Sequence, residues 1–384
     1  MISQVYFTSL RAGYDNSLLT KIRRLAQAAG LQKIVKEKGL TAVKLHFGER
    51  GNTAFIRPLL VRPVVDAIAE AGGRPFITDS GTLYPGTRGN AVDHLNTAIL
   101  NGFAFPVVGA PLVIADGIDG GDEVAVPVNL KHFKEVSIGS AIVRAESLVS
   151  VAHFKLHEAS GFGGAIKNIG MGAASRKGKM AQHSGVAPMV SAKKCIACGV
   201  CLEQCVHGAI SIVERPSDLP SPKNSVTEIM QIDPKLCAGC ARCLHACPQG
   251  AVYINWEKDL PKFMEKMVEY AAGVIKGKEK RSLFINFLTQ ISPACDCYPY
   301  ADAPIVGDIG IAASIDPVAI DQACVDLVNR QPHLESSCLQ GKPPSDDKIR
   351  AVYPHIDWER QLIYAAKLGI GSREYELVEI EKSS

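Results

Sequence analysis

The chain has 384 residues, of which 47% are hydrophobic and 21% charged, so disordered, collagen-like and coiled-coil classes are excluded and two or three domains are expected. The 42 basic and 39 acidic residues give a net charge of +3, which is too small to favour nucleic acid or an anionic membrane surface as the main partner. We find no secretion signal and no apolar run of about 18 residues. We therefore expect a cytoplasmic protein with no nucleic-acid partner and no membrane insertion.

The first half of the chain has an α/β pattern. Short apolar runs rich in β-branched residues predict strands, and apolar residues with helical spacing predict helices between them. The predicted strands are residues 4–8, 41–47, 74–80, 111–117, 123–128 and 147–155, and the predicted helices are residues 17–30, 56–72 and 91–103.

Polar side chains gather where two of these strands end, which is where open α/β sheets bind ligands. His153, Lys155 and His157 alternate along the chain, so an extended backbone places all three on one side. Such a row could bind a metal through its imidazoles, or an anionic group. A solvated strand face is an equally good interpretation for His153 and His157, and a structural role is favoured for the isolated His46.

A glycine-rich turn follows, and it leads to Lys167 and Asn168, which we take as candidate site residues. Its glycines, at 161, 163 and 164, imply close approach of the backbone to a ligand or to a packed neighbour. The spacing matches neither a dinucleotide-binding nor a phosphate-binding loop.

Residues 172–192 are rich in small and basic residues, and this composition predicts a linker that leads into the next segment. Its basic side chains Arg176, Lys177 and Lys179 are interpreted as solvated charge. The alternative is a docking patch for an acidic partner.

Eight of the 12 cysteines form two C-x2-C-x2-C-x3-C motifs that are 42 residues apart. The residues after each motif also repeat, with HGAISI at 207–212 matched by QGAVYI at 249–254. The segment is therefore an internal duplication. The first motif contains Cys195, Cys198, Cys201 and Cys205, and the second contains Cys237, Cys240, Cys243 and Cys247.

This spacing is typical of proteins with two 4Fe–4S clusters, in which the fourth cysteine of each motif ligates the other cluster. We expect Cys195, Cys198, Cys201 and Cys247 to hold one cluster, and Cys237, Cys240, Cys243 and Cys205 to hold the second. Two structural zinc sites are the alternative, but they need only two C-x2-C pairs per metal and no third cysteine at the same step.

The α/β pattern resumes after the motifs. Helices are predicted at 261–277, 317–330 and 357–369, with a strand at 282–288 and an apolar stretch at 304–314. We therefore expect one α/β domain made of residues 1–190 and 255–384, with a mostly open sheet and helices on both faces. An α+β ferredoxin-like module at 191–254 interrupts it.

Two further cysteines, Cys295 and Cys297, lie in a proline-rich loop. They could share an additional metal, and a reduced, partly buried pair is an equally good interpretation. Asp308 follows a predicted strand and is expected to face the same cleft. Cys324 and Cys338 are expected to have no special role.

The runs HFKLHEASGFGGAIKNIGMG from His153, TDSGTLYPGTRGN at 78–90, and CDC followed by DIGIAASIDPVAID resemble the uncharacterised prokaryotic family of domain of unknown function 362. The best match is to members with an inserted bacterial-type ferredoxin domain. The resemblance implies two 4Fe–4S clusters held by the eight cysteines, and an anaerobic source, but no reaction. Six residues match positions that this family keeps and that have no assigned role: His153, His157, Lys167, Asn168, Cys295 and Cys297.

These observations favour an iron–sulfur redox protein in which the inserted module relays low-potential electrons to or from a site in the α/β domain. The six residues that match the family positions are then the candidate catalytic residues, and a small-molecule substrate is expected. The alternatives are a dedicated electron-transfer protein that docks to a partner oxidoreductase, and a structural or sensory iron–sulfur protein. A protein electron donor or acceptor is expected in the first two cases.

Overall fold

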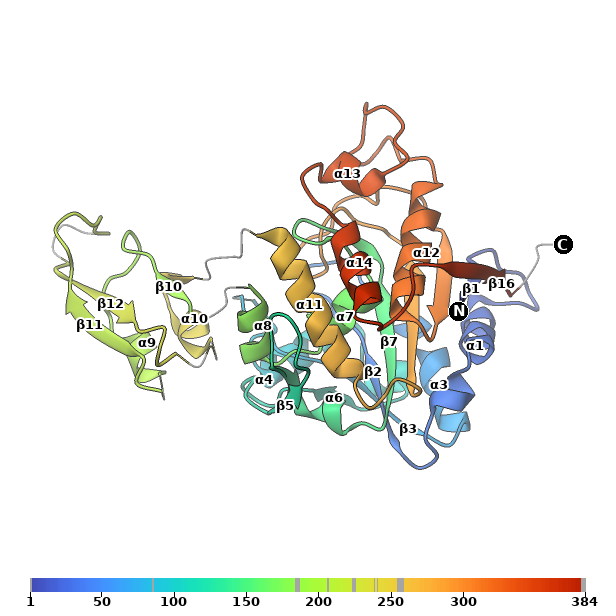
Figure 1. Cartoon of the computed structure of the whole chain (residues 1–384), viewed down its shortest axis with the longest axis horizontal. Helices are drawn as coiled ribbons and strands as arrows, with labels where there is room; N and C mark the ends of the chain where they lie inside the picture. The colour runs from blue at the N-terminus through green and yellow to red at the C-terminus, as the bar shows by residue number, and fades with distance from the viewer. Residues whose placement is uncertain are drawn as a thin grey trace.

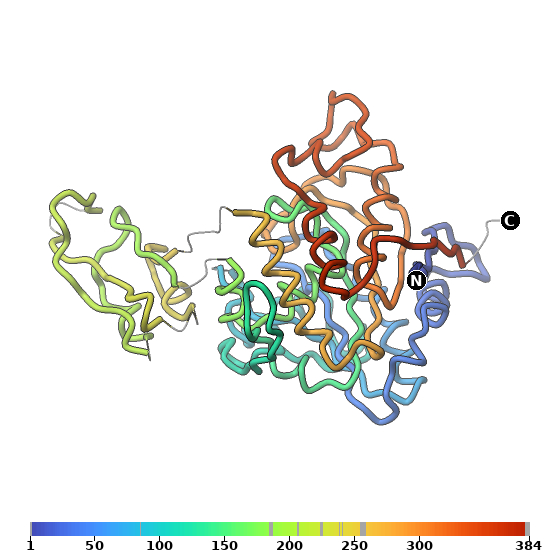
Figure 2. The backbone as a smooth tube through the Cα atoms, viewed as in Figure 1, coloured from blue at the N-terminus to red at the C-terminus, as the bar shows by residue number. Residues whose placement is uncertain are grey.

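The computed structural model describes residues 2–84, 86–183, 187–205, 207–222, 226–237, 239, 241–253 and 259–380. Cys240, an expected ligand of the second cluster, lies outside these residues. We call the described residues before 184 and after 258 the α/β body, and those from 187 to 253 the cysteine-rich module. The module extends from one side of the body (Figure 1), and Figure 2 traces the same path of the chain.

The body is built on an eight-stranded sheet with the order β16-β1-β15-β14-β7-β2-β3-β4. In that order the strands are Tyr375–Glu379, Ser3–Ser9, Gly310–Ser314, Ser282–Leu288, Ser147–His153, Leu40–Lys44, Arg74–Asp79 and Leu112–Ile114. Every neighbouring pair is parallel except the two that involve β15. The predicted α/β class is confirmed, and the sheet is large and mainly parallel.

Strands from before and after the module are neighbours in this sheet. β7 and β14 pair in parallel from Leu148 opposite Ser282 to His153 opposite Phe287. Both strands are buried along their whole length, as expected of central strands in a parallel sheet. The two parts of the body therefore form one sheet.

Helices cover both faces of the sheet (Figure 1). Along β14, Leu283 and Ile285 enter one core while Phe284 and Leu288 enter the other, because successive strand residues point to opposite faces. The first core is covered by α1 (Leu18–Ala28), α2 (Leu31–Ile34), η1 (Pro58–Leu60), α3 (Arg62–Glu70), α4 (Ala91–Leu100) and α5 (Phe105–Val108). The second is covered by α6 (Ser140–Arg144), α7 (Ala165–Gly170), α11 (Leu260–Ile275), α12 (Pro317–Asn329), α13 (Lys348–Val352) and α14 (Glu359–Lys367).

Two short hairpins complete the body, formed by β5 (Glu123–Pro127) with β6 (Glu135–Gly139) and by β8 (Lys155–His157) with β9 (Gly161–Gly163). The module pairs β10 (Met189–Val190) with β13 (Val252–Tyr253), and β11 (Ile210–Glu214) with β12 (Glu228–Ile232). Its helices are α9 (Val200–Glu203) and α10 (Arg242–Ala246). Among the described residues, no helix has the length and apolarity needed to span a bilayer.

The predicted linker at 172–192 is wrong for most of its length, because α8 (Arg176–His183) lies there and is packed on the body. Lys179 is buried and its ammonium donates to the carbonyl of Ala174 at 2.6 Å. Arg176 is buried too, and its guanidinium contacts the carbonyl of Gly89. Only Lys177 is exposed, and it forms an ion pair with Glu123 at 3.3 Å. Arg176 and Lys179 are buried because backbone carbonyls accept their hydrogen bonds, although their charge alone predicts that they are exposed to solvent.

Candidate functional site

Buried polar side chains gather at the carboxyl ends of β2, β3, β7 and β14, at one edge of the sheet. Lys44 ends β2, Asp79 ends β3 and His153 ends β7, and the loop that follows β14 brings Asp296 to the same place. All four side chains are buried. Parallel strands that end together create such a site in many α/β proteins.

Asp296 is the centre of the first network. His153 Nδ1 lies 2.8 Å from Asp296 Oδ1, and Lys155 Nζ lies 3.1 Å from Oδ2. His153 Nε2 lies 2.8 Å from the carbonyl oxygen of Thr289. Both ring nitrogens are thus engaged with oxygen atoms of the protein, and the ring serves to orient Asp296.

The same neighbours set the charge of Asp296. Burial by itself raises the pKa of this carboxyl, but His153 and Lys155 hold the pKa well below its usual range. The alternation of His153 and Lys155 on one side of the chain brings both of them to this carboxylate. The site therefore contains a fixed, ionised aspartate between two cysteines.

Those cysteines form the reactive part of the site. Cys295 is only 2% exposed, and Lys167 Nζ lies 3.8 Å from its sulfur. A hydrogen bond from Cys297 holds the pKa of Cys295 well below its usual value against the effect of burial, with Lys167 and His157 adding to the shift. The same hydrogen bond and burial raise the pKa of Cys297. The pair thus favours one negative charge, which the ammonium of Lys167 stabilises.

In two further histidines, His157 and His46, Nδ1 accepts a hydrogen bond from a nearby backbone N–H. His157 Nδ1 accepts from the backbone N–H of Ala159 at 3.0 Å, so the neutral ring carries its proton at Nε2 and is able to donate to the Cys295 thiolate. His46 Nδ1 accepts from the N–H of Gly48 at 2.9 Å, which gives it the structural role in a turn that was favoured for it.

A second network surrounds Asp79 and Arg88. Lys44 Nζ lies 3.0 Å from Asp79 Oδ1, and Arg88 Nε lies 3.1 Å from Glu49 Oε2. Arg88 also donates to the hydroxyl of Tyr84 at 2.6 Å. Arg88 is 1% exposed, so its charge is neutralised entirely within the protein.

Asn168 joins this network to the sheet. Its Oδ1 accepts from Lys44 Nζ at 3.0 Å, and its Nδ2 donates to the carbonyl of Lys44 at 3.0 Å and to Ser150 Oγ at 2.8 Å. The amide therefore connects α7 to both β2 and β7. Its role is to position Lys44.

The glycine-rich turn packs against protein groups. A Cβ on Gly164 would lie 2.2 Å from Asp321 Oδ1, and a Cβ on Gly161, where φ is +78°, would lie 2.3 Å from Trp358 Cβ. Asp321 accepts from the N–H groups of Ala165 and Ile166 at 2.7 and 2.9 Å. Of the two explanations that the sequence left open, a packed neighbour accounts for these two glycines.

Three residues considered from sequence lie away from the site. Asp308 is exposed and accepts from the N–H of Gln290 at 2.6 Å, so its prediction as a cleft residue is wrong. Cys324 is buried in α12 beside Asn286, and Cys338 is exposed. Glu49 is one of the polar residues that follow the strand predicted at 41–47, so the sequence marked it, whereas Asp79 and Arg88 were not selected as site residues. Asp79, as an acidic residue that ends a predicted strand, carried a usable signal.

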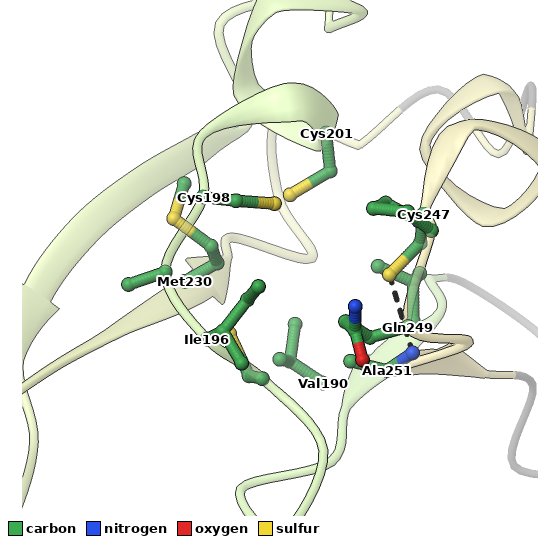
Figure 3. Close-up of a pocket in the computed structure, with 12 residues that line it drawn as sticks. Val190, Ile196, Cys198, Cys201, Met230, Cys247, Gln249 and Ala251 are labelled. Atoms are coloured by element: carbon green, nitrogen blue, oxygen red, sulfur yellow. Dashed lines mark hydrogen bonds between the residues drawn. The ribbon is translucent and has the colours of Figure 1, made fainter. Parts of the chain in front are cut away.

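In the module, the cysteines of the two motifs surround two hollows. The first is lined by Cys195, Cys198, Cys201 and Cys247 and by apolar side chains such as Val190, Met230 and Val252. The second is lined by Cys205, Cys237 and Cys243. Figure 3 shows the sulfur atoms of Cys198, Cys201 and Cys247 pointing into the first hollow. Each hollow therefore receives a cysteine from both motifs.

Backbone amides also point at these sulfurs. The N–H of Ala251 donates to Cys247 Sγ at 3.2 Å, and the N–H of Ala209 donates to Cys205 Sγ at 3.3 Å. The two bonds occupy equivalent places in the duplicated motifs. Within the part of the chain that the structure describes, no group of three His, Cys, Asp or Glu side chains is arranged to hold a metal ion.

Helix α10 docks the module on the body. His245 Nε2 lies 3.0 Å from the carbonyl oxygen of Thr82 and donates to it, and Arg242 forms an ion pair with Asp119. Leu83 packs in the same apolar cluster as Cys195 and Cys243. The loop that receives the module, 82–89, also carries Tyr84 and Arg88 of the buried site.

The family described as "Domain of unknown function (DUF362)" matches residues 41–326 of this chain. No curated protein matches it. Among solved structures, the lactate racemase apoprotein from Thermoanaerobacterium thermosaccharolyticum is similar at 13% identity and a TM-score of 0.38. The match covers 75% of this chain and 51% of that one, so the chain spans about half of its length. A likeness at this level carries no argument about function.

Proposed function

Since the chain belongs to the DUF362 family, whose description names no activity, we propose its function from its own residues. It is an iron–sulfur redox protein. Two 4Fe–4S clusters in the cysteine-rich module, a ferredoxin-type domain, exchange low-potential electrons with the buried site around Cys295 in the α/β body.

The observation that carries this proposal is the set of cysteines around the first hollow. Three come from the first motif and the fourth, Cys247, comes from the second, as expected when the fourth cysteine of each motif ligates the other cluster. Apolar lining and N–H bonds to sulfur are the surroundings that protein-bound clusters have. The described residues of the module therefore fit the group.

The expected ligands of the first cluster are Cys195, Cys198, Cys201 and Cys247, and those of the second are Cys205, Cys237, Cys240 and Cys243. Such clusters supply one-electron transfer at low potential when bound. Among these residues Cys198 is exposed, so the first site reaches the surface of the module. A protein electron donor is proposed to dock there.

The body is proposed to be where the electrons are used. A thiolate at Cys295, a cationic Lys167 and a donating His157 form a reactive group, and Asp296 with its two cationic partners fixes the loop that carries it. The docking of α10 on the loop of Tyr84 and Arg88 supports a coupling of the two regions. The expected class is an oxidoreductase.

Metal analysis of the full chain, purified without oxygen, tests the first part of the proposal. We expect about eight irons and eight acid-labile sulfides per chain. Cys338→Ser, a substitution of an exposed cysteine outside the motifs, is the matched control and should leave both counts unchanged. Two zinc ions per chain and no sulfide would contradict the proposal.

Ligand pairing is tested by single substitutions. Cys195→Ser and Cys247→Ser should remove the same half of the iron and the same electron paramagnetic resonance signal, although the two residues belong to different motifs. Cys205→Ser should remove the other signal. The ligand assignment is wrong if Cys247→Ser removes both signals. It is also wrong if Cys247→Ser removes only the signal that Cys205→Ser and Cys237→Ser remove.

A further inference from the structure

Cys295 and Cys297 are close enough to interact directly. The N–H of Tyr298 donates to the carbonyl of Cys295 at 3.1 Å, so residues 295–298 form a turn, which brings residues two apart closer together than an extended chain does. The two thiols also shift each other's pKa in opposite directions. A disulfide requires that two cysteines have neighbouring Cβ atoms, and the turn provides the close approach of the backbone that such a bond needs.

The loop that carries the pair is held on both sides. The N–H of Glu49 donates to the carbonyl of Asp296 at 3.0 Å. Asn52 Nδ2 donates to the carbonyls of Tyr298 and Tyr300 at 3.1 and 2.9 Å. Together with the ion pairs of the Asp296 side chain, these bonds fix the backbone at and after the two cysteines. The turn that carries both cysteines is therefore held in place by the protein around it.

The surroundings of the pair stabilise negative charge. Lys167 lies 3.8 Å from the sulfur of Cys295, and Arg88 is near enough to act on Cys297. Cationic neighbours of this kind favour a thiolate and oppose the binding of a metal cation. Cys324 provides the contrast, because it is equally buried but has Asp321 and Asp326 near it, and burial and these acids raise its pKa.

We propose that Cys295 and Cys297 form a reversible disulfide, and that this pair is the two-electron acceptor in the body. The electron supply rests on the proposed function. When the disulfide is reduced, the bond between the two sulfurs breaks and the pair takes up two electrons, one from each reduced 4Fe–4S group of the module. Cys295 is left as a thiolate and Cys297 takes one proton from solvent, so charge and atoms balance.

The position of the module fits this role. His245 of α10 bonds to Thr82, and two residues further on Tyr84 accepts from Arg88. Burial raises the pKa of Tyr84, and Cys297 and Cys295 add to the shift. Thr82 thus bonds to the cysteine-bearing helix of the module, and the charge of the cysteine pair acts on Tyr84, two residues further on.

The test of the pair is a thiol–disulfide equilibrium on the full chain without oxygen. The protein is equilibrated in mixtures of reduced and oxidised dithiothreitol, quenched with acid and alkylated after unfolding. Mass spectrometry of the peptide that contains both cysteines then counts the labels. We expect both labels to be lost together at one midpoint potential.

Single variants complete this test. Cys295→Ser and Cys297→Ser should each keep one label in every mixture, whereas Cys324→Ser and Cys338→Ser should show the same transition as the unmodified chain. Two labels at every ratio, up to the most oxidising mixture, would overturn the proposal. So would a transition that survives in Cys295→Ser.

The supply of electrons is tested separately. The oxidised protein is mixed with a photoreduced deazaflavin, and the labels are counted over time in the unmodified chain and in Cys247→Ser. We expect the variant to lose most of the rate at which the pair is reduced. An equal rate would show that the pair does not receive electrons through the module.

These outcomes separate the two proposals. If the pair forms a disulfide but the chain contains no iron or sulfide, the proposed function fails and the disulfide stands. If iron and sulfide are present and the pair never forms a disulfide, the inference fails and the proposed function stands.

Discussion

The α/β body and the cysteine-rich module treat their buried functional side chains in opposite ways. In the body, buried charges such as Asp296 and Arg88 meet partners from the same chain at 2.8 to 3.1 Å. In the module, cysteine sulfurs face two hollows, and backbone N–H groups at 3.2 and 3.3 Å are bonded to two of them. The ion pairs of the body are formed within the chain, whereas the cysteines of the module line two hollows.

The apolar cores of the body and the module differ in size. The body has a large core on each face of its sheet. The module has one small cluster, and Cys195, Cys201 and Cys243 are part of it. Small units with little apolar surface to bury commonly depend on a metal group for stability. The contrast can be tested by perturbing each region separately.

Removal of iron should have the largest effect, and only in one region. After anaerobic treatment with a chelator, amide hydrogen exchange in β11 and β12 should lose its protection, because the hollows would then leave the module with only its small cluster. Protection in β7 and β14 should stay as it was. Unchanged exchange in β11 and β12 after all iron is gone would remove the contrast between the regions.

In the body, loss of one buried charge should be the most destabilising change. Arg88→Met leaves Glu49 buried without its cationic partner, while Asp79 keeps Lys44, and the free energy of unfolding should fall by about 3–5 kcal/mol. Urea unfolding monitored by far-ultraviolet circular dichroism measures this. Arg23→Met, which removes an exposed ion pair with Glu70, is the control and should cost less than about 1 kcal/mol. Equal costs would contradict the assignment of a buried network.

Titration of Asp321 should make the free energy of unfolding depend on pH, by an amount similar to or smaller than the effect of Arg88→Met. Burial raises the pKa of this carboxyl to about 6, although the N–H groups of Ile166 and Ala165 oppose the shift. A group with a raised pKa stabilises the fold below its unfolded pKa, and this contribution is lost as the pH rises through about 6. Between about pH 4 and pH 7 the unmodified chain should lose about 2 kcal/mol relative to Asp321→Asn.

Urea unfolding of both proteins across this pH range measures the difference, since the other titrating groups are common to both. A constant difference between them would show that Asp321 does not titrate in this range.

The smallest effect is expected at the docking contact. The ion pair between Arg242 and Asp119 is more than one third exposed on both sides, so Arg242→Ala should weaken docking by less than about 1 kcal/mol. Hydrogen exchange in residues 86–89, compared at low and high salt, follows the docking. His245→Ala should have the larger effect, because it removes a partly buried hydrogen bond. If Arg242→Ala weakens docking more than His245→Ala does, His245 is not the main docking contact.

The strands of the sheet could be predicted from sequence for a physical reason. β7 and β14 are buried on both faces, so their residues form apolar runs that stand out from their surroundings. The prediction was less complete where one element depends on another. The apolar stretch at 304–314 contains β15 only from Gly310 onward, because the strand begins where β1 and β14 are available as partners.

The candidate site was predictable in part. Cys295, Cys297 and Lys167 were selected from sequence, and the structure brings them together. Arg88 could not be selected, because its loop has the composition of an exposed turn and its burial depends on Glu49 and Tyr84, which are distant or weakly marked in the sequence. The burial of Lys179 could not be predicted either, because its partner is a backbone carbonyl, which the sequence does not mark.

The two places where the chain leaves and re-enters the body lie side by side (Figure 1). The rings of His183 in α8 and Phe263 in α11 stack with centroids 4.9 Å apart, and Lys266 donates to the carbonyl of Ala181 at 3.3 Å. The body thus closes the loop that contains the module. The entropy of closing a loop changes by only about 0.6 kcal/mol for each doubling of its length. A lineage can therefore lengthen, shorten or exchange the segment between α8 and α11 with little effect on the stability of the sheet, and the module can evolve independently of the buried site in the body.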